Sequence, residues 1–132
     1  AKPGARVPIA GSAVGKTLLA RLQTDEVSKL LARVGAEHKT RRTIDALPRM
    51  EAELDRVRDV QFAVDNEEHS VGLRCVASAV FGHHSEPLAA ISISGPTARI
   101  TDDRIDKLGK IVTSVAKEAT AALGGIWPKT MA

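Results

Sequence analysis

The sequence contains few aromatic residues and almost no cysteine. It has no tyrosine, two phenylalanines, one tryptophan and a single cysteine, Cys75. Stacking on aromatic rings is a main source of affinity for single-stranded nucleic acid, so this chain offers little for bases to bind. A lone cysteine cannot form an internal disulfide, which agrees with a reducing compartment. These shortages exclude an internally disulfide-stabilised scaffold and disfavour a single-strand-binding module.

Long apolar runs and a dominant charge are also missing. No run approaches the roughly 18 apolar residues of a membrane span, and the first ten residues, AKPGARVPIA, lack the apolar core of a secretory signal. We therefore expect a cytoplasmic protein without a membrane partner. The 19 basic and 16 acidic residues are interleaved along the chain. Such a surface is typical of a solvated face and differs from a phosphate-binding stripe.

The composition is otherwise that of a soluble domain with one core, because 43% of the residues are hydrophobic and 27% are charged. Apolar residues recur at helical spacing in four segments. The predicted helices are residues 13–23 with Ser12 as cap, a helix from Thr24 to Val34, a helix after Asp45 with Pro48 in its first turn, and a helix from Thr101 to its stop at Gly124. The last helix is expected to bury Ile105, Leu108, Val112, Val115, Ala119 and Leu123.

Between the third and fourth helices the apolar pattern changes to period two, which is typical of strands. The predicted strands include Phe62 and Val64, then Leu73 to Phe81, then Leu88 to Ser94, with the last two joined by a turn from Gly82 to Pro87. Helices and strands do not alternate as a parallel sheet requires, so the class is α+β with an antiparallel sheet. Three strands that are apolar on both faces need more sheet around them, and we expect further strands to precede this segment.

If the turn is symmetric between His84 and Ser85, its strands sort into two faces. Cys75 then lies opposite Ser94, and Ala77 lies opposite Ser92. One face carries the bulky side chains Val76, Val80, Ile91 and Ile93, which suit packing against helices. The other face carries the small side chains Cys75, Ala77, Ala79, Ser92 and Ser94. Small side chains leave room either for a small polar ligand or for a closely packed helix, and the pattern alone leaves both open.

Residues 10–17, AGSAVGKT, meet a loosened phosphate-loop pattern in which Ala10 replaces the first glycine of GxxxxGK[ST]. Such a loop follows a buried strand, whereas the preceding segment is short and contains Pro8. Asp65, at the end of FAVD, would be the magnesium-holding acid. Nucleotide binding therefore stays as the alternative function.

A simpler interpretation of the same segment is a helix capped by Ser12. The free amides of its first turn, at Ala13, Val14 and Gly15, can bind an anion.

Cys75 has two further interpretations. A nucleophilic cysteine needs a nearby base. The sequence contains His69, His83 and His84, but it does not show that any of them lies near Cys75. A metal site with His69 and Asp65 follows no known ligand spacing. A cysteine in the middle of a strand is more often a small buried apolar residue, so we expect no catalytic residue, no metal and no cofactor.

Two long runs then resemble a known family. DNEEHSVGLRCVASAVF, from Asp65 to Phe81, and EPLAAISISGPTARITDDR, from Glu86 to Arg104, are similar to the end of the effector-binding domain of the IclR family of bacterial transcription regulators. VPIAGSAVGKTLLA, from Val7 to Ala20, resembles the segment that opens the first helix of that domain. The three runs cover most of the chain in the family's order.

The resemblance implies a GAF-like domain with an antiparallel sheet flanked by helices, which senses a small carboxylate such as glyoxylate or pyruvate. It implies a transcriptional repressor of the glyoxylate-bypass type that works as a homodimer or homotetramer and is not an enzyme. The family's winged helix-turn-helix domain is not visible in residues 1–132, so we expect operator DNA to be bound only through that separate domain. By position, the effector contacts are Ala13, Val14, Asp65, Cys75, Ser92 and Ser94, with Val7 and Leu73 as apolar wall.

Overall fold

The structure is a computed structural model, which describes residues 4, 9, 11–34, 40–44 and 46–129. The described chain is α+β, as predicted. It contains four helices and one antiparallel sheet, in the order α1 (Ala13–Leu19), α2 (Thr24–Val34), α3 (Leu47–Val60), β1 (Ala63–Asn66), β2 (Leu73–Phe81), β3 (Pro87–Pro96) and α4 (Asp102–Ala122). Even α4, with its 21 residues, is not apolar enough to cross a bilayer, and neither is any other described helix.

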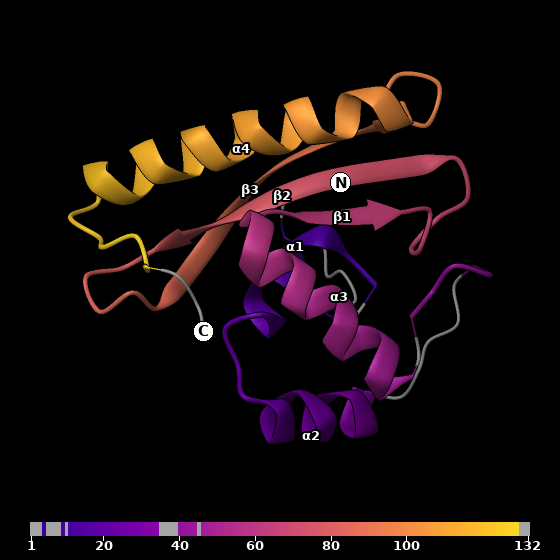
Figure 1. Ribbon diagram of the computed structural model, residues 1–132, viewed down its shortest axis with the longest axis horizontal. Helices are drawn as coiled ribbons and strands as arrows, with labels where there is room; N and C mark the ends of the chain where they lie inside the picture. The colour runs from indigo at the N-terminus through magenta and orange to yellow at the C-terminus, as the bar shows by residue number, and fades with distance from the viewer. Residues whose placement is uncertain (1–3, 5–8, 10, 35–39, 45, 130–132) are drawn as a thin grey trace.

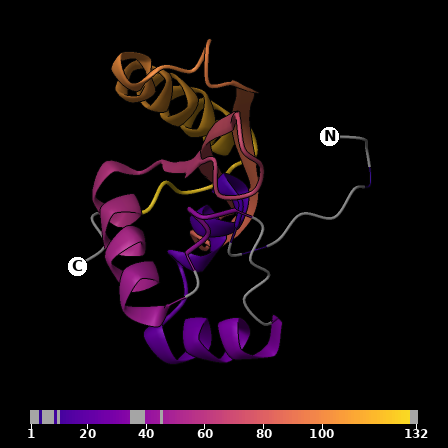
Figure 2. The same ribbon diagram turned by 90° about the vertical axis from the view of Figure 1, so that its right-hand side faces the viewer.

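The elements form three layers (Figures 1 and 2). The sheet, with strand order β1-β2-β3, lies in the middle. Helix α4 covers one face and contacts β2 and β3, whereas α1 packs on the other face and contacts all three strands. Helices α3 and α2 continue outward on the α1 side. The sheet therefore has a different helix on each face, and the two faces can be considered separately.

The bulky face of the sheet packs against α4. Val76 and Val112 are fully buried there, together with the ring of Phe62 at the entrance to β1. Gly109 of α4 sits directly on that ring, because an added Cβ would lie 2.4 Å from Cζ of Phe62. Removing such apolar surface from water is the main favourable contribution to folding. The predicted packing against a helix is confirmed for Val76 and Ile93, which lie in one cluster with Leu108 and Val112 of α4.

The predicted hairpin register is also confirmed. Cys75 pairs with Ser94, and Ala77 pairs with Ser92. Strand β2 has the predicted bounds, whereas β3 is longer than predicted and runs from Pro87 to Pro96. A β-bulge breaks the register between Val80 and Phe81. The bulge lies next to the turn, so it leaves the paired small residues unchanged.

Two helix predictions need correction. Helix α1 ends at Leu19 instead of residue 23, because the chain tightens into a turn in which the amides of Arg21 and Leu22 bond to residues three positions back. Nε of Arg58 donates a hydrogen bond of 2.8 Å to the backbone carbonyl of Ala20, the residue that follows the helix. At α3 the N-cap position is Ala46, without a side-chain cap, and the proposed cap Asp45 lies outside the described residues.

The buried face of α4 also differs from the prediction. Val115 and Leu123 were expected to be inward but are 43% and 66% exposed. The buried line instead follows every fourth residue through Leu108, Val112, Ala116 and Thr120. Small residues on this line let the helix lie close to the sheet, which a pattern of apolar residues does not reveal.

Candidate functional site

The small residues of the sheet form two rows that cross its strands. The register places Asp65 of β1 opposite Cys75 of β2, and Cys75 opposite Ser94 of β3. The neighbouring row contains Ala63, Ala77 and Ser92. Directly paired residues of antiparallel strands point to the same side of a sheet, so both rows face the α1 side.

Helix α1 covers one half of this face and leaves the other half open. Ala63 and Ala77 are fully buried in the same cluster as Ala13 of α1. Cys75 is half-buried, and Ser92 and Ser94 on the edge strand are exposed. The packed-helix interpretation is therefore right for the β1–β2 half, whereas the serine half is accessible and a ligand there stays a prediction.

The first turn of α1 carries two of the expected effector contacts, Ala13 and Val14. Ser12 caps the helix, and its Oγ accepts a hydrogen bond of 3.0 Å from the amide of Gly15. That amide, which we expected to be free for an anion, is therefore used inside the helix. The amides of Ala13 and Val14 occupy first-turn positions that have no acceptor within the helix. Leu73 begins β2 two residues before Cys75 and lies on the same face, whereas Val7 lies outside the described residues.

Asp65 is buried at the end of β1 and has a local structural role. Its Oδ1 accepts hydrogen bonds from the amides of Glu68 at 2.9 Å and His69 at 3.4 Å, which fixes the turn after the strand. Burial raises the pKa of Asp65, although these hydrogen bonds and the nearby Lys16 oppose the increase. A raised pKa means that burial disfavours the charged form of this carboxyl group.

The raised pKa of Asp65 predicts how stability depends on pH. As pH rises, the unfolded chain loses the Asp65 proton first, at the ordinary pKa, while the folded chain keeps it up to the raised pKa. The contribution of Asp65 to the free energy of unfolding is therefore fully present below its ordinary pKa, and it is lost as pH rises through the raised pKa of the folded chain. Compared with Asp65→Asn, the native chain should lose unfolding free energy across this window in denaturant titrations. Asp106→Asn, at an exposed aspartate of α4, keeps Asp65 and should lose unfolding free energy across this window as the native chain does.

Cys75 lies beside serines, and its environment disfavours the thiolate. Burial raises the pKa of the Cys75 thiol, and the negative charge of Asp65 acts in the same direction, while hydrogen bonds with Ser94 and Ser92 oppose it. Nucleophilic cysteines instead have a lowered pKa beside a cation. Within the described ranges, no group of three or more His, Cys, Asp or Glu residues is placed to hold a metal ion. The geometry thus suits a small polar wall better than a reactive centre.

Lys16 decides against the phosphate-loop interpretation. Its side chain is 1% exposed, and its Nζ lies 2.7 Å from Oε1 and 2.8 Å from Oε2 of Glu68. The same Nζ donates to the carbonyl oxygen of Val64 at 2.8 Å. A phosphate-binding lysine must reach the ligand, whereas Lys16 is committed to a buried ion pair that joins α1 to the turn after β1. Residues 10–17 therefore match the phosphate-loop sequence pattern without having its lysine available for a phosphate.

The Lys16–Glu68 pair was not expected from the sequence. Charged residues in a helix are normally assigned to the surface, and Glu68 lies among other polar residues in EEHS. Nothing in the local sequence around Lys16 identifies its partner.

Comparison with known proteins identifies the family. The family model "Bacterial transcriptional regulator IclR C-terminal" matches residues 1–121. The chain is 44% identical over 123 residues to the transcriptional repressor IclR of Escherichia coli, covering 93% of this chain and 45% of that protein. It is 43% identical over 122 residues to the acetate operon repressor of Salmonella typhimurium, covering 92% of this chain and 44% of that protein.

The fold agrees with these matches. The crystal structure of the C-terminal domain of the E. coli transcriptional regulator KdgR has a TM-score of 0.83 and 36% identity, covering 92% of this chain and 74% of that one. The chain therefore belongs to the IclR family of bacterial transcriptional regulators and corresponds to its C-terminal regulatory domain. It spans less than half the length of the two curated repressors.

Proposed function

We propose that this chain is the effector-sensing domain of a transcriptional repressor and that it binds a small carboxylate on the open half of its small-residue face. The observation that supports this most strongly is the row Asp65–Cys75–Ser94, which continues from a buried acid to an exposed serine across three strands. Ser92 lies beside the row on the same edge strand. The family match makes a regulatory role the natural use of such a face.

The chemistry of the face suits a carboxylate ligand. The hydroxyls of Ser92 and Ser94 and the amides of Ala13 and Val14 are hydrogen-bond donors, and charge-assisted bonds to an anion are stronger than neutral ones. Asp65 would accept from a protonated, hydrated or water-bridged group of the ligand. Small 2-oxo acids such as glyoxylate and pyruvate match this donor set in size and charge.

The remaining parts of the function belong to the larger protein. We propose that a winged helix-turn-helix domain N-terminal to this segment binds operator DNA, and that the regulator is a cytoplasmic homodimer or homotetramer. The curated relatives named as repressors support this assignment, including one named for the acetate operon. Sensing by this domain would then control operator occupancy.

A thermal-shift series tests whether a carboxylate binds. Pyruvate and glyoxylate are expected to raise the melting temperature in a saturable way, because a ligand that binds only the folded state stabilises it. Pyruvamide, which has the same size and no charge, should have little effect. No shift with any small carboxylic acid would support a domain used only for oligomerisation. A shift that requires a nucleoside triphosphate and magnesium would instead support nucleotide binding.

Alkylation of Cys75 tests whether the ligand binds on the small-residue face. Cys75 is the only cysteine of the chain, so iodoacetamide labels one position. Saturating pyruvate is expected to slow labelling, and the carbamidomethylated protein should no longer respond to pyruvate because the added group would occupy the place proposed for the ligand. Labelling at an unchanged rate in the presence of bound pyruvate would place the ligand elsewhere. A measurable reaction lost in Cys75→Ser would indicate an enzyme.

A further inference from the structure

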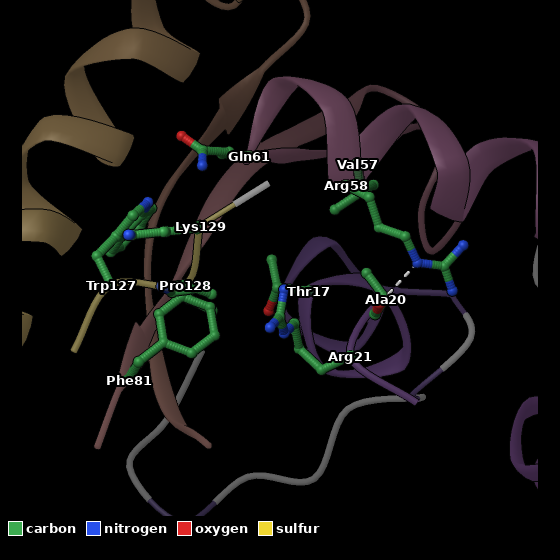
Figure 3. A pocket seen from close by; sticks show the side chains of 11 residues that line it. Thr17, Ala20, Arg21, Val57, Arg58, Gln61, Phe81, Trp127, Pro128 and Lys129 are labelled. Atoms are coloured by element: carbon green, nitrogen blue, oxygen red, sulfur yellow. Dashed lines mark hydrogen bonds between the residues drawn. The ribbon is translucent and has the colours of Figure 1, made fainter. Parts of the chain in front are cut away.

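A hollow lies between the C-terminal ends of α1 and α3, the end of β2 and the tail that follows α4. It holds about 410 Å³ of empty space, including the part open to solvent. None of its eleven lining residues is acidic, and three are cationic: Thr17, Ala20, Arg21, Val57, Arg58, Gln61, Ala79, Phe81, Trp127, Pro128 and Lys129 (Figure 3). It shares Ala79 with the small-residue face, but none of the residues proposed to contact the effector lines it.

The tail that completes this hollow is held in place by specific contacts. The amide of Ile126 donates to the carbonyl of Gly82 at 3.0 Å, and the hydroxyl of Ser85 donates to the carbonyl of Ile126 at 3.0 Å. Trp127 packs edge-on against Phe81, with 5.1 Å between ring centroids. The family match ends at residue 121, so this tail lies outside the matched region.

The free polar groups of the hollow are donors. The guanidinium of Arg21 lies 5.1 Å from the centroid of Phe81 and has no carboxylate within 4.0 Å in the described part of the chain. Nε1 of Trp127, which can only donate, is buried without a hydrogen-bond partner among the described residues. Lys129 adds an exposed ammonium group at the edge.

Arg58 differs from Arg21 because its donors are already used. Its Nε bonds to the carbonyl of Ala20, and its Nη1 lies 2.8 Å from Oδ1 of Asp55. Figure 3 shows its guanidinium directed toward Ala20, whereas that of Arg21 lies between Thr17 and Phe81. Burial and the charge of Arg58 both lower the pKa of Arg21. A second cation without a counterion is therefore held beside an apolar wall, a setting that an anion would stabilise.

We propose that this hollow binds a small organic carboxylate with an apolar or aromatic body. The carboxylate would pair with Arg21 and accept from Nε1 of Trp127, while the body would contact Phe81, Pro128 and Val57. Charge-assisted pairing of a planar guanidinium with a carboxylate supplies orientation, and the aromatic wall supplies apolar contact. The chain thus has a second ligand site in addition to its sensing face.

Trp127 is the only tryptophan, so its fluorescence reports on this hollow alone. Benzoate titrated into the chain is expected to change the fluorescence in a saturable way, and benzamide, its neutral counterpart, should bind at least about tenfold more weakly. Calorimetry should give the same dissociation constant for benzoate as fluorescence. Equal binding of benzoate and benzamide, or no binding of benzoate, would overturn the proposal.

Variants with matched controls test whether benzoate binds in this hollow. Arg21→Gln is expected to weaken benzoate about 10- to 100-fold, because one charge-assisted pairing is lost. Arg49→Gln, at an exposed arginine of α3, should leave the affinity unchanged. Gly125→Ala should also abolish binding, since its Cβ would lie 1.9 Å from the carbonyl oxygen of Phe81 and displace the tail. Ser94→Ala should not alter benzoate binding, and a loss there would assign benzoate to the sensing face and contradict a second site.

Discussion

Replacing Lys16 by methionine is expected to lower the free energy of unfolding by about 3–5 kcal/mol. The substitution keeps most of the side-chain volume but leaves the carboxylate of Glu68 buried, with an exposed fraction of 4% for the residue. Removing one partner of a buried ion pair costs more than the pair itself contributes, because the remaining charge has lost its counterion. Urea denaturation at neutral pH measures the change.

Two further variants establish that the effect comes from the ion pair. Lys29→Met, at an exposed lysine of α2, should change stability by no more than about 0.5 kcal/mol. The double change Lys16→Met with Glu68→Gln should recover part of the loss, because the uncompensated charge is gone while the side-chain oxygen can still accept from the amide of Asn66. If Lys16→Met folds as stably as the native chain and loses only nucleotide binding, the structural role assigned to Lys16 is wrong.

Ser92→Ala and Ser94→Ala are each expected to weaken pyruvate or glyoxylate binding about 10- to 150-fold. Each change removes a hydrogen bond to a charged group, worth roughly 1.5–3 kcal/mol, and about 1.4 kcal/mol corresponds to a factor of ten. Both serines are exposed on the edge strand, so water can replace the hydrogen bonds that their hydroxyls make with Cys75. The unfolding free energy should therefore hardly change. Calorimetry and denaturant titration of the same variants measure the two effects.

The opposite pattern would indicate a packed face without a ligand. If the serines only complete a contact inside the protein, their removal alters the unfolding free energy and leaves the ligand response untouched. Ser114→Ala, at an exposed serine of α4, is the matched control and should change neither quantity. An unchanged affinity in both variants for a ligand that binds the native chain would reject the assignment of Ser92 and Ser94.

The sequence predicted the β2–β3 half of the site because local rules determine it. A short turn between strands of period two specifies which residues pair, so Cys75 could be placed opposite Ser94 before the structure was known. The place of Asp65 in the same row depends on the longer connection after β1, which has no simple pairing rule. Only the family resemblance assigned Asp65 to the site.

The parts that could not be predicted depend on contacts between distant segments. Lys16 and Glu68 are 52 positions apart, and nothing in the local pattern of either residue specifies the other. The same holds for α4, where Gly109 allows close contact with the ring of Phe62 and so selects a buried line of small residues. Apolar periodicity identified the helix but assigned Val115 and Leu123 to the wrong side.

The most direct test of carboxylate sensing is a titration of the ¹⁵N-labelled chain with pyruvate, followed by amide chemical shifts. The largest shifts are expected at Ala13, Val14, Asp65, Cys75, Ser92 and Ser94, and all should saturate at one dissociation constant. Amides around Arg21 and Trp127 should move little, because the proposed second site requires an apolar body that pyruvate lacks. Saturable shifts confined to any other region, or none at concentrations that stabilise the protein, would contradict a sensing site on the small-residue face.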